Sequence, residues 1–133
     1  MSQQDVVIVR GALEALGRGD MDGFLAAYDP AVEARVPPSL PWGGVHRGHE
    51  GIRQLIAGIA QAFEPGVEIG LDDILDGGAV VVPLVRVRGR GRASGCEVDM
   101  QVVELFRLRA GLVVDIDVFY KDTAALLGVL AAT

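Results

Sequence analysis

The chain has 133 residues, a formal net charge of −6 and 50% hydrophobic residues. This length is typical of one domain. The acidic balance argues against a nucleic-acid partner, because affinity for nucleic acids comes largely from cationic contacts with phosphates. We therefore expect a single domain over residues 1–133, with a core large enough to fold without disulfides.

The first half of the chain carries mainly helical and loop patterns. Apolar residues recur at helical spacing, Asp20 is a candidate N-cap, and Pro30 ends the segment that Asp20 begins. A proline- and glycine-rich stretch predicts a rigid loop. The predicted elements are helices over 5–17, 20–28 and 50–63, a short strand over 31–36 and the loop over 37–48.

The second half alternates apolar and polar residues, which is typical of strands. Short glycine-containing turns separate these strands, as in hairpins, and Asp122 is a candidate cap for a last helix. Helices followed by a meander of strands indicate an α+β fold with an antiparallel sheet. The predicted strands are 67–75, 79–90, 96–109 and 112–120, and the last helix is 122–132.

The compartment is predicted from what the sequence lacks. The one cysteine, Cys96, cannot form an internal disulfide, as is usual in a reducing cytoplasm. Cys96 has no Cys or His neighbour at metal-ligand spacing, and the N-terminus has no signal-peptide pattern. No apolar run approaches the ~20 residues of a membrane helix. We expect a cytoplasmic protein with no metal, cofactor or membrane partner.

One face of the predicted sheet is charged. Arg86 and Arg88 alternate with apolar residues and can share a face with Glu97 and Asp99 of the next strand, where opposite charges stabilise a sheet. This pattern favours a solvated, charge-paired outer face. The alternative, an anion site, lacks the glycine-rich strand–helix turn of a phosphate loop.

Glu104 interrupts the apolar row of the other face. In MQVVELFRLR, residues 100–109, it shares a face with Met100, Val102 and Phe106. A buried carboxylate is costly unless it is paired, and burial raises its pKa. Acids in such places are candidates for catalysis. The alternatives are a structural ion pair, for example with Arg35, or a position at the sheet edge in contact with water.

The order of these elements resembles the SnoaL-like polyketide cyclases and ketosteroid isomerases of the NTF2-like superfamily. Three stretches carry the resemblance: GRGDMDGFLAAYDPAVEARV, GGVHRGHEGIRQLI and VVELFRLRAGLVVDIDVFYKD. The resemblance implies a cone, in which a curved antiparallel sheet wraps around an apolar cavity closed by the N-terminal helices. It also implies a homodimer and a small apolar ligand.

The family's functional residues match this chain only in part. Ketosteroid isomerases hold a protonated acid in the oxyanion hole, and through ELFR that position resembles Glu104. The family's tyrosine matches Ala12, its general base matches Arg35, and the acid of the cyclases matches Val118, with Asp115 and Asp117 of opposite parity beside it. Ordinary ketosteroid isomerase chemistry is therefore not expected.

Other polar residues are candidates around such a cavity. Tyr120 lies on the inward row, as a pocket residue or as packing with its hydroxyl at the rim. Trp42 lies at the cavity mouth or plugs the helices, and His46 is a loop acid/base or simply exposed. His49 is more typical of a surface or capping residue, and Tyr28 of a buried structural aromatic.

We expect a SnoaL-like enzyme with acid–base chemistry on an apolar cyclic or polyketide-like compound. Its alternative is a non-catalytic binding or dimeric accessory module for a small apolar ligand. The expected catalytic residues are Glu104, His46 and Tyr120. The expected ligand-binding residues are Arg35, Trp42, Met100, Val102, Ile116 and Val118.

Overall fold

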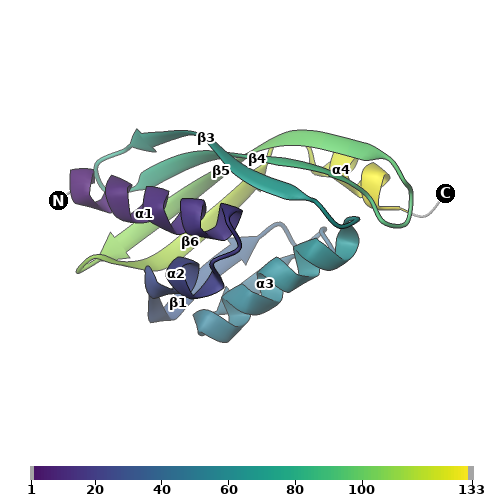
Figure 1. Cartoon of the computed structure of the whole chain (residues 1–133). Coiled ribbons are helices and arrows are strands. Elements are labelled where there is room, and N and C mark those ends of the chain that lie inside the picture. The colour runs from purple at the N-terminus through teal and green to yellow at the C-terminus, as the bar shows by residue number, and fades with distance from the viewer. Residues whose placement is uncertain (1, 132–133) are drawn as a thin grey trace.

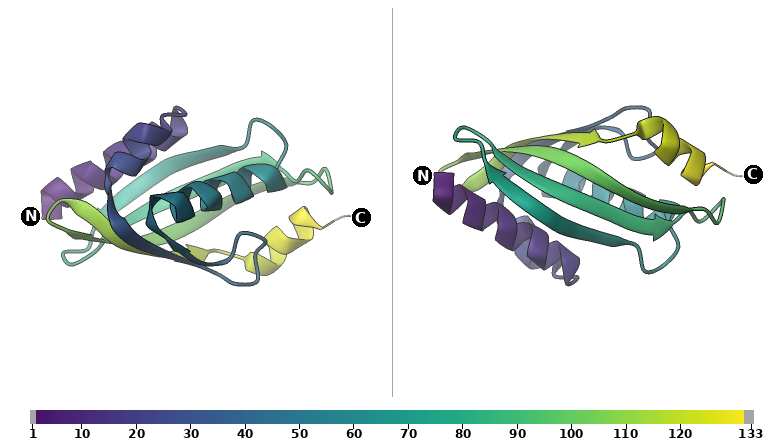
Figure 2. Two further views of the ribbon diagram at one scale, coloured as in Figure 1. Left: turned by 90° about the horizontal axis from the view of Figure 1, so that it is seen from below. Right: turned by 90° about the horizontal axis from the view of Figure 1, so that it is seen from above.

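Three helices cover the concave face of one curved sheet, and a fourth lies at the far end of the molecule (Figures 1 and 2). The computed structural model describes residues 2–131. None of its helices has the length and apolarity needed to cross a membrane. The helices are α1 Ser2–Gly17, α2 Met21–Ala26, α3 Gly48–Ala62 and α4 Thr123–Leu130. The strands are β1 Tyr28–Val36, β2 Gly44–Arg47, β3 Glu68–Asp76, β4 Val81–Arg90, β5 Glu97–Arg109 and β6 Leu112–Tyr120.

The strands form a single sheet in the order β2-β1-β6-β5-β4-β3. The α+β prediction is confirmed, and β3 to β6 form the expected meander of antiparallel neighbours. The expectation of a purely antiparallel sheet is wrong for one pair, because β1 runs parallel to β6. No hairpin joins these two strands, so their relative direction is set by tertiary packing. No turn residue in the sequence predicts this direction.

Strand β1 begins earlier than expected. Tyr28 and Pro30 lie within it and do not end the second helix, which stops at Ala26. Pro30 is tolerated because the pairing with β6 is irregular between Tyr28 and Glu33, where a missing backbone donor does no harm. The loop predicted over 37–48 also contains a short strand, β2, which pairs with the end of β1.

Two aspartates cap helices as expected. The Oδ1 atom of Asp20 accepts a hydrogen bond from the backbone N–H of Gly23 at 2.9 Å, at the start of α2. The Oδ1 atom of Asp122 does the same for Ala125, also at 2.9 Å, at the start of α4. Each bond satisfies a donor that the first helical turn leaves without a partner.

The outer sheet face is charge-paired, which confirms the simpler interpretation of the arginine run. Arg86 donates to Asp72 and to Asp99, each at 2.8 Å, so it bridges β3 and β5 from β4. Arg90 donates to Glu97 at 2.6 Å. These arginines pair with carboxylates of neighbouring strands, and exposed ion pairs of this kind contribute modestly to stability.

The turn between β5 and β6 carries backbone strain that a substitution can relieve. Ala110 has a φ of 51° and Gly111 a φ of 79°, the conformation of a two-residue turn that favours Asn-Gly. We expect Ala110→Asn to raise the free energy of unfolding by about 0.5–1 kcal/mol, because alanine pays a steric cost at positive φ. Urea denaturation measures the change. Gly111→Ala, the matched control, should destabilise the protein, and equal effects of both variants would contradict this account.

Candidate functional site

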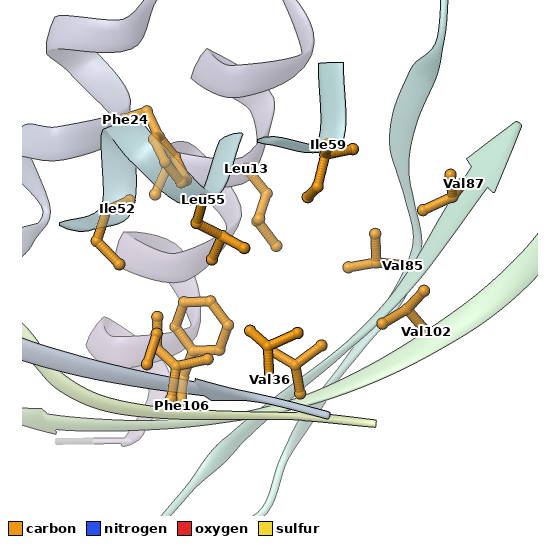
Figure 3. Packing of buried hydrophobic residues seen from close by; sticks show 14 of the residues in the cluster. Leu13, Phe24, Val36, Ile52, Leu55, Ile59, Val85, Val87, Val102 and Phe106 are labelled. Carbon is orange, nitrogen blue, oxygen red and sulfur yellow. The ribbon is translucent and has the colours of Figure 1, made fainter. Parts of the chain in front are cut away.

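A narrow cavity lies between the helices and the concave sheet face. Figure 3 shows side chains of α1, α2 and α3, such as Leu13, Phe24 and Leu55, pointing toward Val102 and Phe106 of the sheet. Its volume, counted as space open to the centre of a water molecule, is about 60 Å³. The lining is apolar apart from three side chains, Tyr28, Glu104 and Tyr120.

Among residues 2–131, Glu104 is the one carboxyl group on the cavity wall. It lies on central strand β5, opposite Val118 of β6 and level with Pro83 of β4, so it is not at a sheet edge. The residue is partly buried, and its side chain lines the cavity. Burial away from bulk water raises its pKa to about 7. Near neutral pH, therefore, protonated and ionised forms coexist.

No side chain in residues 2–131 neutralises Glu104. The carboxyl group has neither a salt bridge nor a hydrogen bond there, so the expected alternative of a pair with Arg35 is wrong. A buried polar group without a partner is costly. Because no side chain of the described residues occupies them, the carboxyl oxygens of Glu104 are available to a molecule in the cavity.

Two tyrosine hydroxyl groups share the cavity with Glu104. Tyr28 is 3% exposed, and its ring packs near Phe106 with centroids 6.4 Å apart. Burial, and then the negative charge of Glu104, raises the pKa of Tyr28 well above its ordinary value. Burial also raises the pKa of Tyr120, with a smaller contribution from Glu104. Both tyrosines therefore stay protonated and are hydrogen-bond donors at neutral pH.

The loop before β2 holds one of these tyrosines. Trp42 is 4% exposed, as expected for a hydrophobic plug over the helices and not for a side chain at an open cavity mouth. Its Nε1–H donates to the hydroxyl oxygen of Tyr120 at 3.0 Å. Since that bond uses the oxygen as acceptor, the hydroxyl hydrogen of Tyr120 is left to donate elsewhere.

The two histidines support the backbone around this site. His46 lies on β2, and its Nε2 donates to the carbonyl oxygen of Trp42 at 2.8 Å. It does not line the cavity, so the expected proton transfer from His46 to a cavity ligand has no direct route. His49, at the start of α3, donates from Nε2 to the carbonyl oxygen of Tyr28 at 2.7 Å. It therefore fixes the chain where Tyr28 enters the cavity wall.

The other expected ligand-binding residues fall into two groups. Val102, Ile116 and Val118 line the cavity, whereas Trp42 and Met100 are buried outside its lining. Val118 therefore takes the inward position that the cyclase resemblance assigns to an acid.

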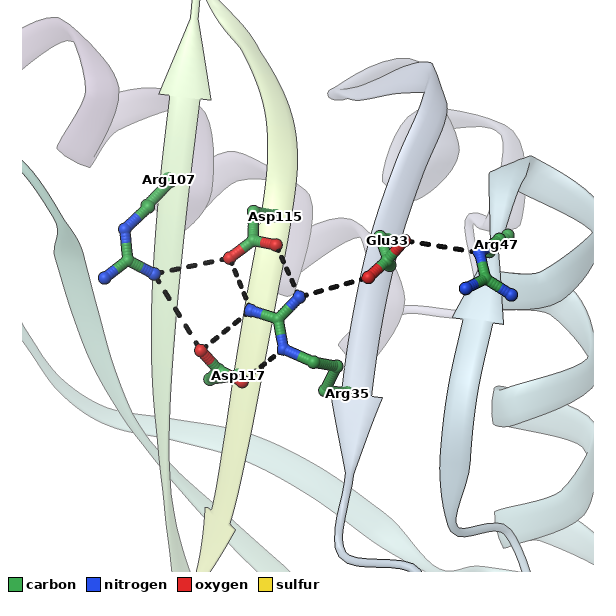
Figure 4. Close-up of polar contacts among 6 residues, drawn as sticks. All are labelled: Glu33, Arg35, Arg47, Arg107, Asp115 and Asp117. Atoms are coloured by element: carbon green, nitrogen blue, oxygen red, sulfur yellow. Dashed lines mark hydrogen bonds and ion pairs between the residues drawn. The ribbon is translucent and has the colours of Figure 1, made fainter.

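Arg35 lies on the opposite sheet face from the cavity, which corrects its expected place. It donates to both oxygens of Asp115 at 2.8 Å and to those of Asp117 at 2.8 and 2.9 Å (Figure 4). The guanidinium group holds the pKa of Asp115 below its usual range. Arg35 alternates along β1 with the inward residues Val32, Ala34 and Val36. Its side chain therefore points to the other face of the sheet. This cluster joins β1 to β6 and has no access to the cavity.

Among the described residues, Tyr28 is the polar residue of the cavity that the sequence does not predict as a site residue. The sequence predicts Tyr28 as the last residue of a helix, where the alternation of strand residues between two faces does not apply. Read as the first residue of β1, it falls on the same even row as Val32, Ala34 and Val36, which faces the cavity. Residues 2–131 contain no group of three His, Cys, Asp or Glu side chains placed to hold a metal ion.

Comparisons with known proteins place this geometry in a family. Residues 9–116 match the model of the SnoaL-like domain. The uncharacterized protein Rv0034 of Mycobacterium tuberculosis is 28% identical over 124 residues, which is 91% of this chain and 92% of that protein.

Solved structures agree with the same fold. An NTF2-like protein from Burkholderia xenovorans has a TM-score of 0.81 and 28% identity, with 97% of each chain covered. An NTF2-like protein from Burkholderia thailandensis has a TM-score of 0.87 and 25% identity, covering 96% of this chain and 97% of that one. A putative SnoaL-like polyketide cyclase from Jannaschia has a TM-score of 0.80 and 22% identity, covering 98% and 94%. The chain therefore belongs to the SnoaL-like family, with an NTF2-like fold.

Proposed function

We propose that the protein binds a small, largely apolar molecule in the cavity and acts on it by acid–base chemistry at Glu104. The observation that carries the proposal is a carboxyl group without a partner in residues 2–131 on an otherwise apolar wall. A cyclic or polyketide-like compound with a carbonyl group fits this chemistry, and the similarity to a SnoaL-like polyketide cyclase supports it. The protonated acid would donate to the carbonyl oxygen, assisted by the hydroxyl of Tyr28 or Tyr120.

Stabilisation of an enol or enolate is the chemistry that such donors supply. Charge develops on the carbonyl oxygen as an adjacent C–H bond breaks and its proton passes to a water molecule in the cavity, and the protonated Glu104 stabilises that charge. A protonated carboxyl group of pKa near 7 matches this task, because it is present at neutral pH and donates strongly.

The second candidate is a binding module without catalysis. It is favoured by the lining itself, in which Glu104 is accompanied only by two tyrosines as titratable groups. In the described part of the chain, no second carboxylate or histidine lines the cavity to remove a proton. The homodimer and the cytoplasmic location expected from the sequence stay predictions.

Acetophenone, a compact aryl ketone, tests the proposal by isothermal titration. We expect it to bind roughly tenfold more tightly at pH 5.5 than at pH 8.5, because ionisation of Glu104 removes the donor. Glu104→Gln keeps an N–H donor at both pH values, so its affinity should not change with pH. Cumene has nearly the same shape without the oxygen and is the ligand control. An unchanged pH dependence in Glu104→Gln would contradict the role of this residue.

Chemistry is separated from binding by exchange of the ketone's methyl hydrogens for deuterium, followed by NMR. Exchange that is faster with the wild-type protein than with Glu104→Gln supports an enzyme. Binding with equal exchange in both supports the binding module.

A further inference from the structure

A second hollow, the α1–α3–β3 groove, lies beside the cavity. It is open to solvent, and its volume of about 400 Å³ is several times the 60 Å³ of the cavity on the same measure. Of the residues that the structure describes, Glu68 is the one charged side chain on its wall. The groove is lined by Leu16, Gly17, Ile56, Ile59, Ala60, Val67, Glu68, Ile69 and Gly70.

The cavity and the groove have a wall in common. Leu16 of α1, Ile56 and Ile59 of α3, and Ile69 of β3 line both hollows. Three of these four aliphatic side chains are only partly buried. Side chains therefore separate the two hollows, and aliphatic side chains can change rotamer at much lower cost than backbone can move.

The cavity is several times smaller than the groove on the same measure. It accommodates a polar head and a short apolar section next to Glu104. The remaining apolar bulk of a larger molecule needs a neighbouring space, and the groove offers an apolar one beside Ile59 and Ile69, which line both hollows.

We infer that the ligand is elongated, with an oxygen-bearing head at Glu104 and a hydrocarbon tail that passes between Leu16, Ile56 and Ile69 into the α1–α3–β3 groove. This inference rests on the proposed function, because that function places the head. It adds the shape of the ligand and a tail subsite. The groove is open at its outer side, so it sets no sharp upper limit to the tail.

A pair of unbranched methyl ketones, 2-octanone and 2-dodecanone, tests the tail subsite by isothermal titration. Each buried methylene contributes about 0.8 kcal/mol, which corresponds to roughly a fourfold gain in affinity. We expect 2-dodecanone to bind at least tenfold more tightly than 2-octanone. A gain below twofold would mean that the additional four carbons find no apolar site.

Two variants on neighbouring residues of α3 locate the tail. Ala60 is exposed and lines the groove but not the cavity, whereas Gln61 is exposed and lines neither. We expect Ala60→Phe to reduce the affinity for 2-dodecanone at least tenfold and that for 2-octanone less than twofold. Gln61→Phe should change neither. Since both residues are exposed, both variants should fold, and circular dichroism verifies this.

The outcomes separate the two proposals. If 2-octanone binds in a Glu104-dependent manner but the longer ketone gains nothing, the tail subsite is overturned and the proposed function stands. Equal effects of Ala60→Phe and Gln61→Phe also overturn the subsite. If acetophenone binds but neither unbranched ketone does, only the elongated ligand is overturned. If none of the three ketones binds, the proposed function and the inference fall together.

Discussion

We expect the free energy of unfolding of the wild-type protein to fall by roughly 3 kcal/mol, relative to Glu104→Gln, between about pH 4.5 and pH 7. The pKa of Glu104 is raised by burial from 4.5 to about 7 in the folded protein. Within this window the unfolded chain has lost the proton and the folded chain keeps it. The folded state therefore binds more protons, and its stability is full below pH 4.5 and decreases as the pH rises through 7.

Urea denaturation at half-unit pH intervals measures this difference. Glu97→Gln is the matched control, because Glu97 lies on the same strand with a side chain that is 75% exposed and paired with Arg90. It should lower the free energy of unfolding by less than about 1 kcal/mol, because an exposed ion pair contributes little to stability. A constant difference between the wild-type protein and Glu104→Gln across the window would show that Glu104 titrates normally, and the reason for regarding it as a site residue would disappear.

The stability that the ionised Glu104 costs the protein at neutral pH is an argument for a functional role. A glutamine or leucine at residue 104 would avoid the desolvation of a carboxylate, yet the chain places an acid on a central strand opposite Val118. Groups that reduce stability in this way concentrate at functional sites. The expected pH dependence of stability and that of ketone binding share one cause, and both should vanish together in Glu104→Gln.

How much of this could be predicted from the sequence depends on the range of each pattern. Strand alternation is local, and it placed Glu104, Val118 and Tyr120 on the inward row, where they line the cavity. Caps are local too, and Asp20 and Asp122 bond as expected. Alternation also gave Asp115 and Asp117 the outward parity that they have.

What could not be predicted depends on contacts between distant segments. Arg35 was expected in the cavity because a family position was matched without knowledge of the strand's exact start, and a shift of one residue moves a side chain to the other face. Its partners Asp115 and Asp117 lie 80 and 82 residues away along the chain. Tyr28 was missed for the same reason, since its strand begins where a helix was expected to end.

Replacing Trp42 by Ala is expected to lower the free energy of unfolding by about 3–5 kcal/mol, the usual cost of removing a large buried aromatic side chain. Trp42 is 4% exposed. Its ring lies 6.1 Å from that of Phe63 and 6.2 Å from that of Tyr120, measured between centroids. The substitution removes this packing and the hydrogen bond to Tyr120 together. Urea denaturation followed by circular dichroism measures the change, because Trp42 is the only tryptophan of the chain.

A double-mutant cycle separates the hydrogen bond from the packing. Trp42→Phe keeps most of the apolar surface and loses the N–H donor, whereas Tyr120→Phe removes the acceptor and leaves the Trp42 N–H without its partner. We expect a coupling energy between the two substitutions of about 1 kcal/mol.

Ser39→Ala, at an exposed position of the same loop, should change stability by less than about 0.5 kcal/mol. If Trp42→Ala cost no more than Ser39→Ala, the loop would not be the plug that holds the Tyr120 hydroxyl, and Tyr120 would turn freely in the cavity. A coupling energy near zero with a large loss in Trp42→Ala would instead assign the effect to packing, and leave the orientation of the Tyr120 hydroxyl to the ligand.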